Sequence, residues 1–191
     1  MTEGTLTSGA ADRSSLQLRG DVLPAEYLEE RWYAAQTSAN HEKRVAEQLN
    51  LRAVEAYLPL YTSVRRWKDR RVRLELPLFP GYVFVRLALR DRLQVLQTPS
   101  VARLVGFGGQ PTPLPEQEID SLRRGLTHDM LIEPHPYLKV GQRVRVKTGP
   151  LQGLEGLLLR RKKTSRFVIS LDLIMRSVAV EIDTAELEPV R

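Results

Sequence analysis

The spacing of apolar and polar side chains predicts an alternation of strands and helices in the first part of this chain. Apolar residues dominate the short run 32–37, which is typical of a strand, and Val45 and Leu49 then recur at helical spacing. Residues 57–66 and 71–87 are predicted to form two extended strands, because both are rich in apolar residues and WKDR between them is typical of a turn. The two strands would form a hairpin with a basic tip.

Three further elements are predicted before the pattern changes. Residues 91–97 favour a short helix, which ends at Thr98-Pro99 because the residue before a proline avoids helical conformation. Residues 101–105 favour a strand, and Ile119 and Leu122 lie on one face of a last helix. The order strand, helix, strand, strand, helix, strand, helix predicts an α+β fold of the split βαβ type, an antiparallel sheet with helices on one face.

The pattern of apolar and polar residues is different in the last quarter of the chain. Short strand-like runs separated by turns occupy it, and no helical period is long enough to compete. This pattern predicts a small closed or nearly closed β-barrel. We therefore expect a disordered leader, an N-terminal domain, a linker and a barrel domain, with the boundaries 1–26, 27–127, 128–137 and 138–191.

Composition narrows the class of protein. The chain has 191 residues, 42% hydrophobic and 27% charged, which is enough for two small domains with buried cores. It contains no cysteine, which excludes disulfides, thiolate metal sites and a cysteine nucleophile. The three histidines form no ligand pattern, so we expect no metal and no cofactor.

The apolar runs and the N-terminus indicate the cellular location that we expect for the protein. The longest, residues 76–85, contains two prolines and ends at Arg86, whereas a membrane span takes about 20 apolar residues. The N-terminus has no basic start followed by an apolar stretch, so it does not resemble a secretory signal. We expect a cytoplasmic monomer without membrane contact.

The apolar run 76–85 is also the first candidate binding surface. A regular strand would place Leu78, Tyr82 and Phe84 on one face and Phe79, Val83 and Val85 on the other. If the helices cover one sheet face, the second face would be an exposed apolar patch suited to docking. The alternative is a central strand buried on both sides, with a bulge at Pro80-Gly81 that resets the alternation. The pattern favours neither.

The hairpin tip is the second candidate. The formal charge of the chain is +6, and six basic residues face one acidic residue between positions 65 and 73. Such a cluster attracts phosphates, and Trp67 can stack on a base. A solvated tip kept soluble by its charge is the alternative. The candidate nucleic-acid residues here are Arg65, Arg66, Trp67, Lys68, Arg70, Arg71 and Arg73.

A family resemblance joins these features. The first domain contains WYAAQTSANHEKRVAEQL, the basic hairpin, LFPGYVFV, TPSVARLVGFGG and PLPEQEI in that order, and it resembles the N-terminal domain of NusG family transcription elongation factors. VGQRVRVKTGPLQGLEGLLLRR resembles the KOW motif of the same family. The close spacing of hairpin and LFPGYVFV is more similar to the specialised RfaH and UpxY type than to the housekeeping factor.

The resemblance implies roles for particular residues. It implies that one sheet face binds the clamp helices of the largest RNA polymerase subunit, through Gln36, Phe79, Pro80, Tyr82 and Phe84. A buried aromatic anchor of this kind costs about 2 kcal/mol or more on truncation. Near a polymerase, the basic hairpin would attract the phosphates of upstream or non-template DNA. The resemblance implies that the helix start, with His41, Lys43 and Arg44, faces the exposed non-template strand.

In the barrel, the turn motif has a mechanical interpretation: its glycines allow a tight turn and close backbone approach. The motif residues are Gly149, Pro150, Gly153 and Gly156. The resemblance implies that the barrel recruits Rho or a small-subunit ribosomal protein, with Ile174 where the family has an aromatic contact residue. Refolding of the barrel into a helical hairpin, known in some members, is disfavoured by the β-branched residues of 166–182.

These features predict a transcription elongation factor that binds RNA polymerase, reduces pausing or termination, and recruits a partner through its KOW domain. The alternative is a ribosome-associated or RNA-binding KOW protein without polymerase contact. An enzyme is not expected, because the sequence offers no clustered carboxylates, no nucleophile with a base and no phosphate-binding glycine loop.

Overall fold

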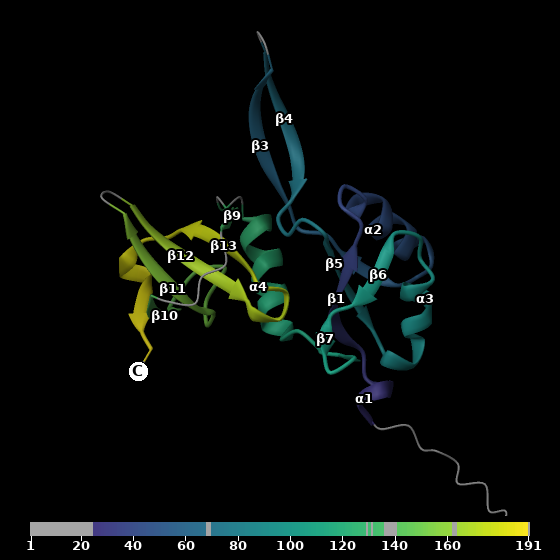
Figure 1. The fold of residues 1–191 in the computed structure, drawn as a ribbon. Helices are drawn as coiled ribbons and strands as arrows, with labels where there is room; N and C mark the ends of the chain where they lie inside the picture. Colours follow the sequence, from purple (N-terminus) through teal and green to yellow (C-terminus); the bar gives the residue numbers. More distant parts are fainter. Residues whose placement is uncertain are drawn as a thin grey trace, which may run out of the picture.

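A computed structural model describes residues 25–67, 70–128, 130, 132–135, 141–161 and 164–190 (Figure 1). The predicted leader, except for its last two residues, lies outside these residues, as does Lys68. The first part contains α1 (Ala25–Leu28), β1 (Arg31–Thr37), α2 (Glu42–Leu51), β2 (Glu55–Tyr57), β3 (Leu60–Trp67), β4 (Arg70–Pro77), β5 (Tyr82–Leu87), the 3₁₀ turn η1 (Leu89–Asp91), α3 (Arg92–Leu96), β6 (Val101–Leu104), β7 (Gly106–Phe107), β8 (Gln110–Pro111) and α4 (Glu116–Thr127).

Four of these strands form an antiparallel sheet in the order β2-β5-β1-β6. Because successive side chains of a strand point to opposite faces, β1 contributes Tyr33 and Ala35 to one face and Trp32 and Ala34 to the other. The α+β class is confirmed.

Two helices cover the first face. α2 presents Val45 and Leu49 at helical spacing, and α3 presents Val95, to a cluster that also holds Val83 and Val85 of β5. The last helix differs from the expectation, because Ile119 and Leu122 of α4 belong to the cluster on the opposite face.

The basic hairpin is a two-stranded sheet of its own. β3 and β4 pair from Leu60 opposite Pro77 to Trp67 opposite Arg70, and the hairpin stands away from the rest of the molecule (Figure 1). The second predicted strand, 71–87, is interrupted: β4 ends at Pro77 and β5 begins at Tyr82. The first, 57–66, is likewise divided between β2 and β3.

The C-terminal part is a six-stranded antiparallel sheet in the order β14-β10-β11-β12-β13-β9, as expected for a KOW-like barrel. Its elements are β9 (Ile132–His135), β10 (Gln142–Val146), β11 (Glu155–Arg161), β12 (Thr164–Leu171), η2 (Asp172–Ile174), β13 (Arg176–Glu181), η3 (Thr184–Glu186) and β14 (Leu187–Pro189).

One of these strands falls inside the predicted linker, 128–137. β9 pairs with β13 at the end of the sheet order, with Pro134 opposite Val178. An edge strand tolerates a proline, because one side of its backbone needs no ladder hydrogen bond. Residues 132–135 therefore extend the barrel sheet.

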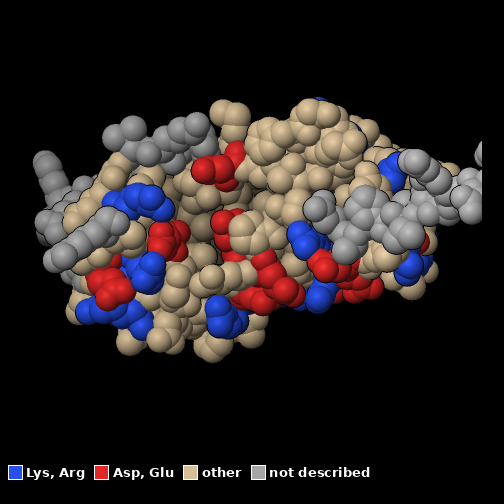
Figure 2. Space-filling view, turned by 90° about the horizontal axis from the view of Figure 1, so that it is seen from below, with Lys and Arg blue, Asp and Glu red and all other residues tan. Residues whose placement is uncertain are grey.

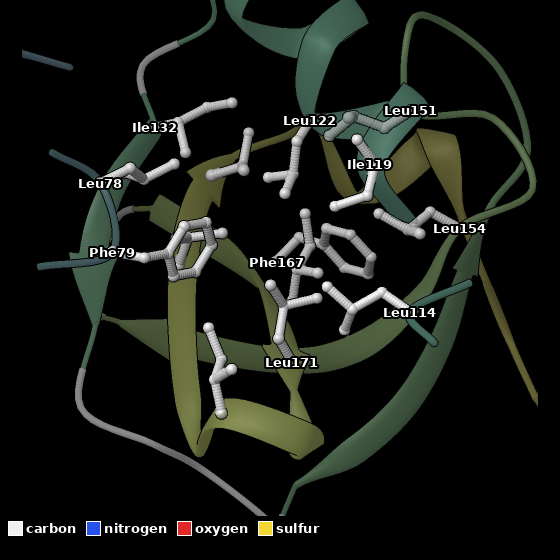
Figure 3. Packing of buried hydrophobic residues seen from close by; sticks show 14 of the residues in the cluster. Leu78, Phe79, Leu114, Ile119, Leu122, Ile132, Leu151, Leu154, Phe167 and Leu171 are labelled. Carbon is white, nitrogen blue, oxygen red and sulfur yellow. The ribbon is translucent and has the colours of Figure 1, made fainter. Parts of the chain in front are cut away.

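The two parts share one hydrophobic cluster. It joins the second face of the N-terminal sheet, α4 and the barrel, and its labelled members in Figure 3 are Leu78, Phe79, Leu114, Ile119, Leu122, Ile132, Leu151, Leu154, Phe167 and Leu171. α4 lies between the two sheets (Figure 1). The barrel and α4 thus cover the sheet face that α2 and α3 leave open.

Candidate functional site

A tight turn places Phe79. The Tyr82 backbone N–H donates a hydrogen bond to the Phe79 carbonyl at 3.1 Å, and Gly81 has φ +85°. Proline followed by a residue of positive φ is the pattern of a type II turn, and glycine meets that φ without strain. The Thr37 N–H also donates to the Gly81 carbonyl at 2.8 Å, which fixes the turn to the end of β1.

This turn corrects the predicted alternation. Phe79 does not share a face with Val83 and Val85, because Pro80-Gly81 resets the direction of the side chains. Instead its ring meets that of Phe84 edge-on, with centroids 5.5 Å apart, and Tyr57 stacks on Phe84 at 6.3 Å. Of the two predicted alternatives, the strand with a bulge at Pro80-Gly81 is closer to the structure than the regular strand.

The aromatic face is not exposed to solvent. Phe79 is 1% exposed and Phe84 0%, so the expectation of an open apolar patch is wrong for this conformation. The cluster that contains these rings also holds side chains of α4 and the barrel, whereas α2 and α3 lie on the other side of the sheet.

The other predicted members of this face lie at its margin. Pro80 is exposed, Tyr82 is half-buried, and the Arg176 guanidinium of the barrel lies 5.9 Å from the centre of the Tyr82 ring. Gln36 is also half-buried, and its Oε1 accepts a hydrogen bond from Arg103 Nε at 2.9 Å. All five predicted residues therefore come from β1, β5 and the turn between β4 and β5.

The predicted contact residue of the barrel lies in the same cluster. Ile174, in η2, is 4% exposed and belongs to the cluster that contains Phe79. Two surfaces predicted to bind different partners are thus both covered in this arrangement.

The sequence analysis missed the residue that fastens α4 to the sheet. The Arg123 guanidinium lies 4.7 Å from the centre of the Trp32 ring and 4.8 Å from that of Tyr57, and its Nη2 pairs with Glu55 at 2.8 Å. Burial raises the pKa of Tyr57 to about 12, although the nearby Arg123 charge opposes the shift. No local pattern indicates this contact, because Arg123 and Glu55 are far apart in sequence.

Acidic side chains gather near the middle of the face seen from below (Figure 2). Glu118 lines a hollow together with Gln117 of α4 and Arg145, Gly153 and Glu155 of the barrel. Burial, and next the negative charge of Asp172, raise the pKa of Glu118 to about 7. This carboxyl therefore titrates near neutral pH at the boundary of the two parts.

The hairpin presents exposed cations. Arg70, Arg71 and Arg73 are exposed along β4. The strand register sets the backbone of Arg66 opposite that of Arg71. The predicted residues Arg65, Arg66 and Trp67 lie on β3, where only the backbone is described, and Lys68 is outside the described residues.

The start of α2 forms a second polar region. His41, Lys43 and Arg44 are exposed, and His41 Nδ1 lies 2.6 Å from Ser100 Oγ. The Ser38 N–H donates to the Ser100 carbonyl at 2.9 Å, and Asn40 and Ser100 both have positive φ. The three predicted residues therefore lie together, beside the loop that precedes β6.

The KOW turn fits its mechanical interpretation. Gly149 and Gly153 have φ near +85°, and the Gly153 N–H donates to the Val146 carbonyl at 2.9 Å. A Cβ on Gly156 would lie 2.5 Å from the Val168 carbonyl oxygen, so only glycine fits there. Pro150 follows Gly149 and is half-buried.

Comparison with known proteins agrees with this architecture. A family model described as "Transcription termination factor nusG" matches residues 30–123. The transcription termination/antitermination protein NusG of Lactococcus lactis is 29% identical over 178 residues, covering 86% of this chain and 95% of that protein. The protein of the same name from Escherichia coli K12 is 29% identical over 180 residues, covering 86% and 98%.

The fold has a solved counterpart. A structure described as "Domain interaction in Thermotoga maritima NusG" covers 86% of this chain and 99% of its own, with a TM-score of 0.54 and 22% identity. The likeness concerns the fold, an N-terminal α+β domain followed by a small β-barrel. The chain is thus similar to NusG proteins over most of its length. Its membership of the RfaH and UpxY type stays a prediction.

Within the part of the chain that is described, no helix has the length and apolar character of a membrane span.

Proposed function

We propose that this chain is a transcription elongation factor that binds RNA polymerase through the aromatic face formed by Gln36, Phe79, Pro80, Tyr82 and Phe84. The factor works by binding, and the process it serves, termination or antitermination, is the one named for its relatives. It would reduce pausing or termination only insofar as it binds the elongating polymerase better than the paused one.

One observation carries the proposal. The ring of Phe79 lies on a face that α2 and α3 do not cover, and it belongs to a cluster that also holds α4 of its own domain and the C-terminal barrel. A domain can be displaced as a unit, whereas α2 and α3 are part of the N-terminal core. The face is therefore an apolar surface that another macromolecule could occupy in place of the barrel.

The covered arrangement sets a condition for binding. Polymerase would have to bind the uncovered form. The apparent affinity of the chain for polymerase would therefore fall in proportion to the fraction of molecules in that form. Because Phe79 and Ile174 are buried in one cluster, uncovering would free both surfaces together. The partner of the barrel would be Rho or a small-subunit ribosomal protein, as the family resemblance implies.

The hairpin would supply the nucleic-acid contact. Its exposed arginines stand away from the aromatic face, so a polymerase on that face leaves them free to meet upstream DNA (Figure 1). Phosphate contacts of this type depend on salt and are largely independent of sequence. The helix start with His41, Lys43 and Arg44 would face the non-template strand.

The direct test is the rate at which the full-length chain leaves immobilised core RNA polymerase. Dissociation reports the bound form alone, because the barrel covers the face only in the free chain. Phe79→Ala should leave at least about thirtyfold faster, the equivalent of about 2 kcal/mol. Phe107→Ala is the matched control, since Phe107 is 70% exposed on the β7–β8 hairpin.

An unchanged rate for Phe79→Ala would remove the assignment of this face. Measuring affinity at several salt concentrations distinguishes this proposal from the alternative, an RNA-binding KOW protein held by phosphate contacts. Such a protein loses about a thousandfold in affinity between 50 and 200 mM salt for roughly six contacts, whereas an apolar contact weakens far less.

A further inference from the structure

We propose that Glu42 is a positioning residue that holds the Phe79 turn in the orientation needed for binding. This inference rests on the proposed function, because it assigns Glu42 a role at the same face. Glu42 is the first residue of α2, and its Oε1 accepts a hydrogen bond from the Gly81 backbone N–H at 2.8 Å.

The burial of Glu42 is unusual for its side chain. It is 3% exposed, and glutamate is rarely this buried unless its charge is satisfied. The first turn of a helix favours a negative charge, since its free N–H groups carry partial positive charge. The helix start thus holds the carboxylate, and the Gly81 N–H is the partner it meets from outside the helix.

The geometry of the turn explains why this bond matters. In a type II turn the internal hydrogen bond runs from the last residue to the first, here from Tyr82 to Phe79, and it leaves the N–H of Gly81 unused. Glu42 accepts from that N–H, while the Gly81 carbonyl accepts from Thr37. Gly81 is therefore held from α2 on one side and from β1 on the other.

The consequence concerns Phe79. The turn joins the hairpin to β5, so a shift of Gly81 away from α2 and β1 would also move Phe79, the first residue of the same turn. Because α2 belongs to the opposite face of the sheet, Glu42 fixes the aromatic face without touching the surface that a partner would contact. Its neighbours Lys43 and Arg44 are exposed and cannot replace it.

The test uses the full-length chain and three substitutions at one position. Glu42→Ala removes the acceptor, Glu42→Asp keeps the charge but shortens the side chain, and Glu42→Gln keeps an oxygen acceptor at full length. The matched control is Glu47→Ala, the same change at an exposed position of α2. We measure the dissociation rate from immobilised core RNA polymerase, the melting temperature, and the Gly81 amide proton by NMR.

Glu42→Ala and Glu42→Asp should dissociate from polymerase about tenfold faster than the wild type, because a hydrogen bond to a charged group is lost. Glu42→Gln and the control Glu47→Ala should stay within about twofold of the wild-type rate. In the first two variants the Gly81 amide proton should shift upfield and exchange faster. If Ala does not fold, Asp supplies the comparison.

Two results would overturn the inference: an unchanged Gly81 amide in Glu42→Ala or Glu42→Asp, or unchanged dissociation of these variants while Phe79→Ala leaves faster. Failure of the proposed function has a different signature. In that case Phe79→Ala itself leaves at the wild-type rate, and the amide signal alone decides whether Glu42 holds the turn.

Discussion

The two faces of the N-terminal sheet are buried to the same degree by very different parts of the chain. Tyr33 and Val85 lie under α2 and α3, which are connected to the sheet by short loops. Trp32 and Phe84 lie under α4 and a barrel that begins only at residue 132. Burial alone therefore does not distinguish a permanent core from a covered binding surface.

The borders of the two faces differ as well. The Arg176 guanidinium of the barrel lies over the Tyr82 ring of the second face, and Glu118 lies close to Asp172 where α4 meets the barrel. Charged contacts are more readily exchanged for water than apolar ones, which is expected where two parts separate and rejoin. We thus treat the first face as core and the second as an interface.

The largest expected effect is a loss of stability caused by a substitution in the core of the first face. Leu49→Ala removes a fully buried side chain of α2 and should lower the free energy of unfolding by about 3 kcal/mol. Since Leu49 does not contact the barrel cluster, the distance between the two domains should be unchanged. Urea unfolding measures the first quantity, and fluorescence energy transfer between dyes on Leu51→Cys and Glu188→Cys measures the second.

The control is Leu51→Ala, an exposed leucine of the same helix, which should be close to neutral. A change in energy transfer in Leu49→Ala before unfolding begins would contradict the separation of the two faces.

A smaller effect concerns the second face, whose covering should depend on pH. In the covered form the pKa of Glu118 is about 7, against an ordinary value of 4.5 that we assign to the open form. The covered form therefore binds this proton more tightly: its advantage is complete below pH 4.5 and is lost as the pH rises through 7. The constant for covering should fall up to about tenfold between pH 6 and 8.

The same pair of dyes reports this shift as a loss of energy transfer. Glu118→Gln should stay covered at pH 8 and lose the pH dependence, whereas Glu181→Gln, an exposed glutamate of β13, should retain it. Identical titrations of the wild type and Glu118→Gln would exclude the carboxyl as the cause.

Much of the fold could be predicted from the sequence, because periodicity is a local property. Val45 and Leu49 predicted α2, and short strand-like runs predicted the C-terminal barrel. The hairpin followed from two extended runs around WKDR, although β4 and β5 were merged because the Pro80-Gly81 turn lies inside an apolar run. β9 was missed because Pro134 argues against a strand unless the strand lies at an edge.

The candidate site was predictable only in part. The motif around Phe79 predicts a binding face, but nothing local indicates what covers it, since an apolar side chain suits a core and an interface equally. The bond from Glu42 to Gly81 joins residues 39 positions apart, and a glutamate at a helix start is ordinarily solvated. Long-range contacts of this kind appear only in the folded chain.

The most direct measurement of the central claim is polymerase binding by a chain whose barrel is locked in place. Gln117→Cys and Arg145→Cys add two thiols, on the α4 side and the barrel side of one hollow, to a chain that has no cysteine of its own, and a short bismaleimide can join them. The account predicts that the joined chain does not bind core RNA polymerase, while the same double variant binds before joining. Equal binding by the joined and unjoined chains would show that the covered face is not the polymerase-binding surface.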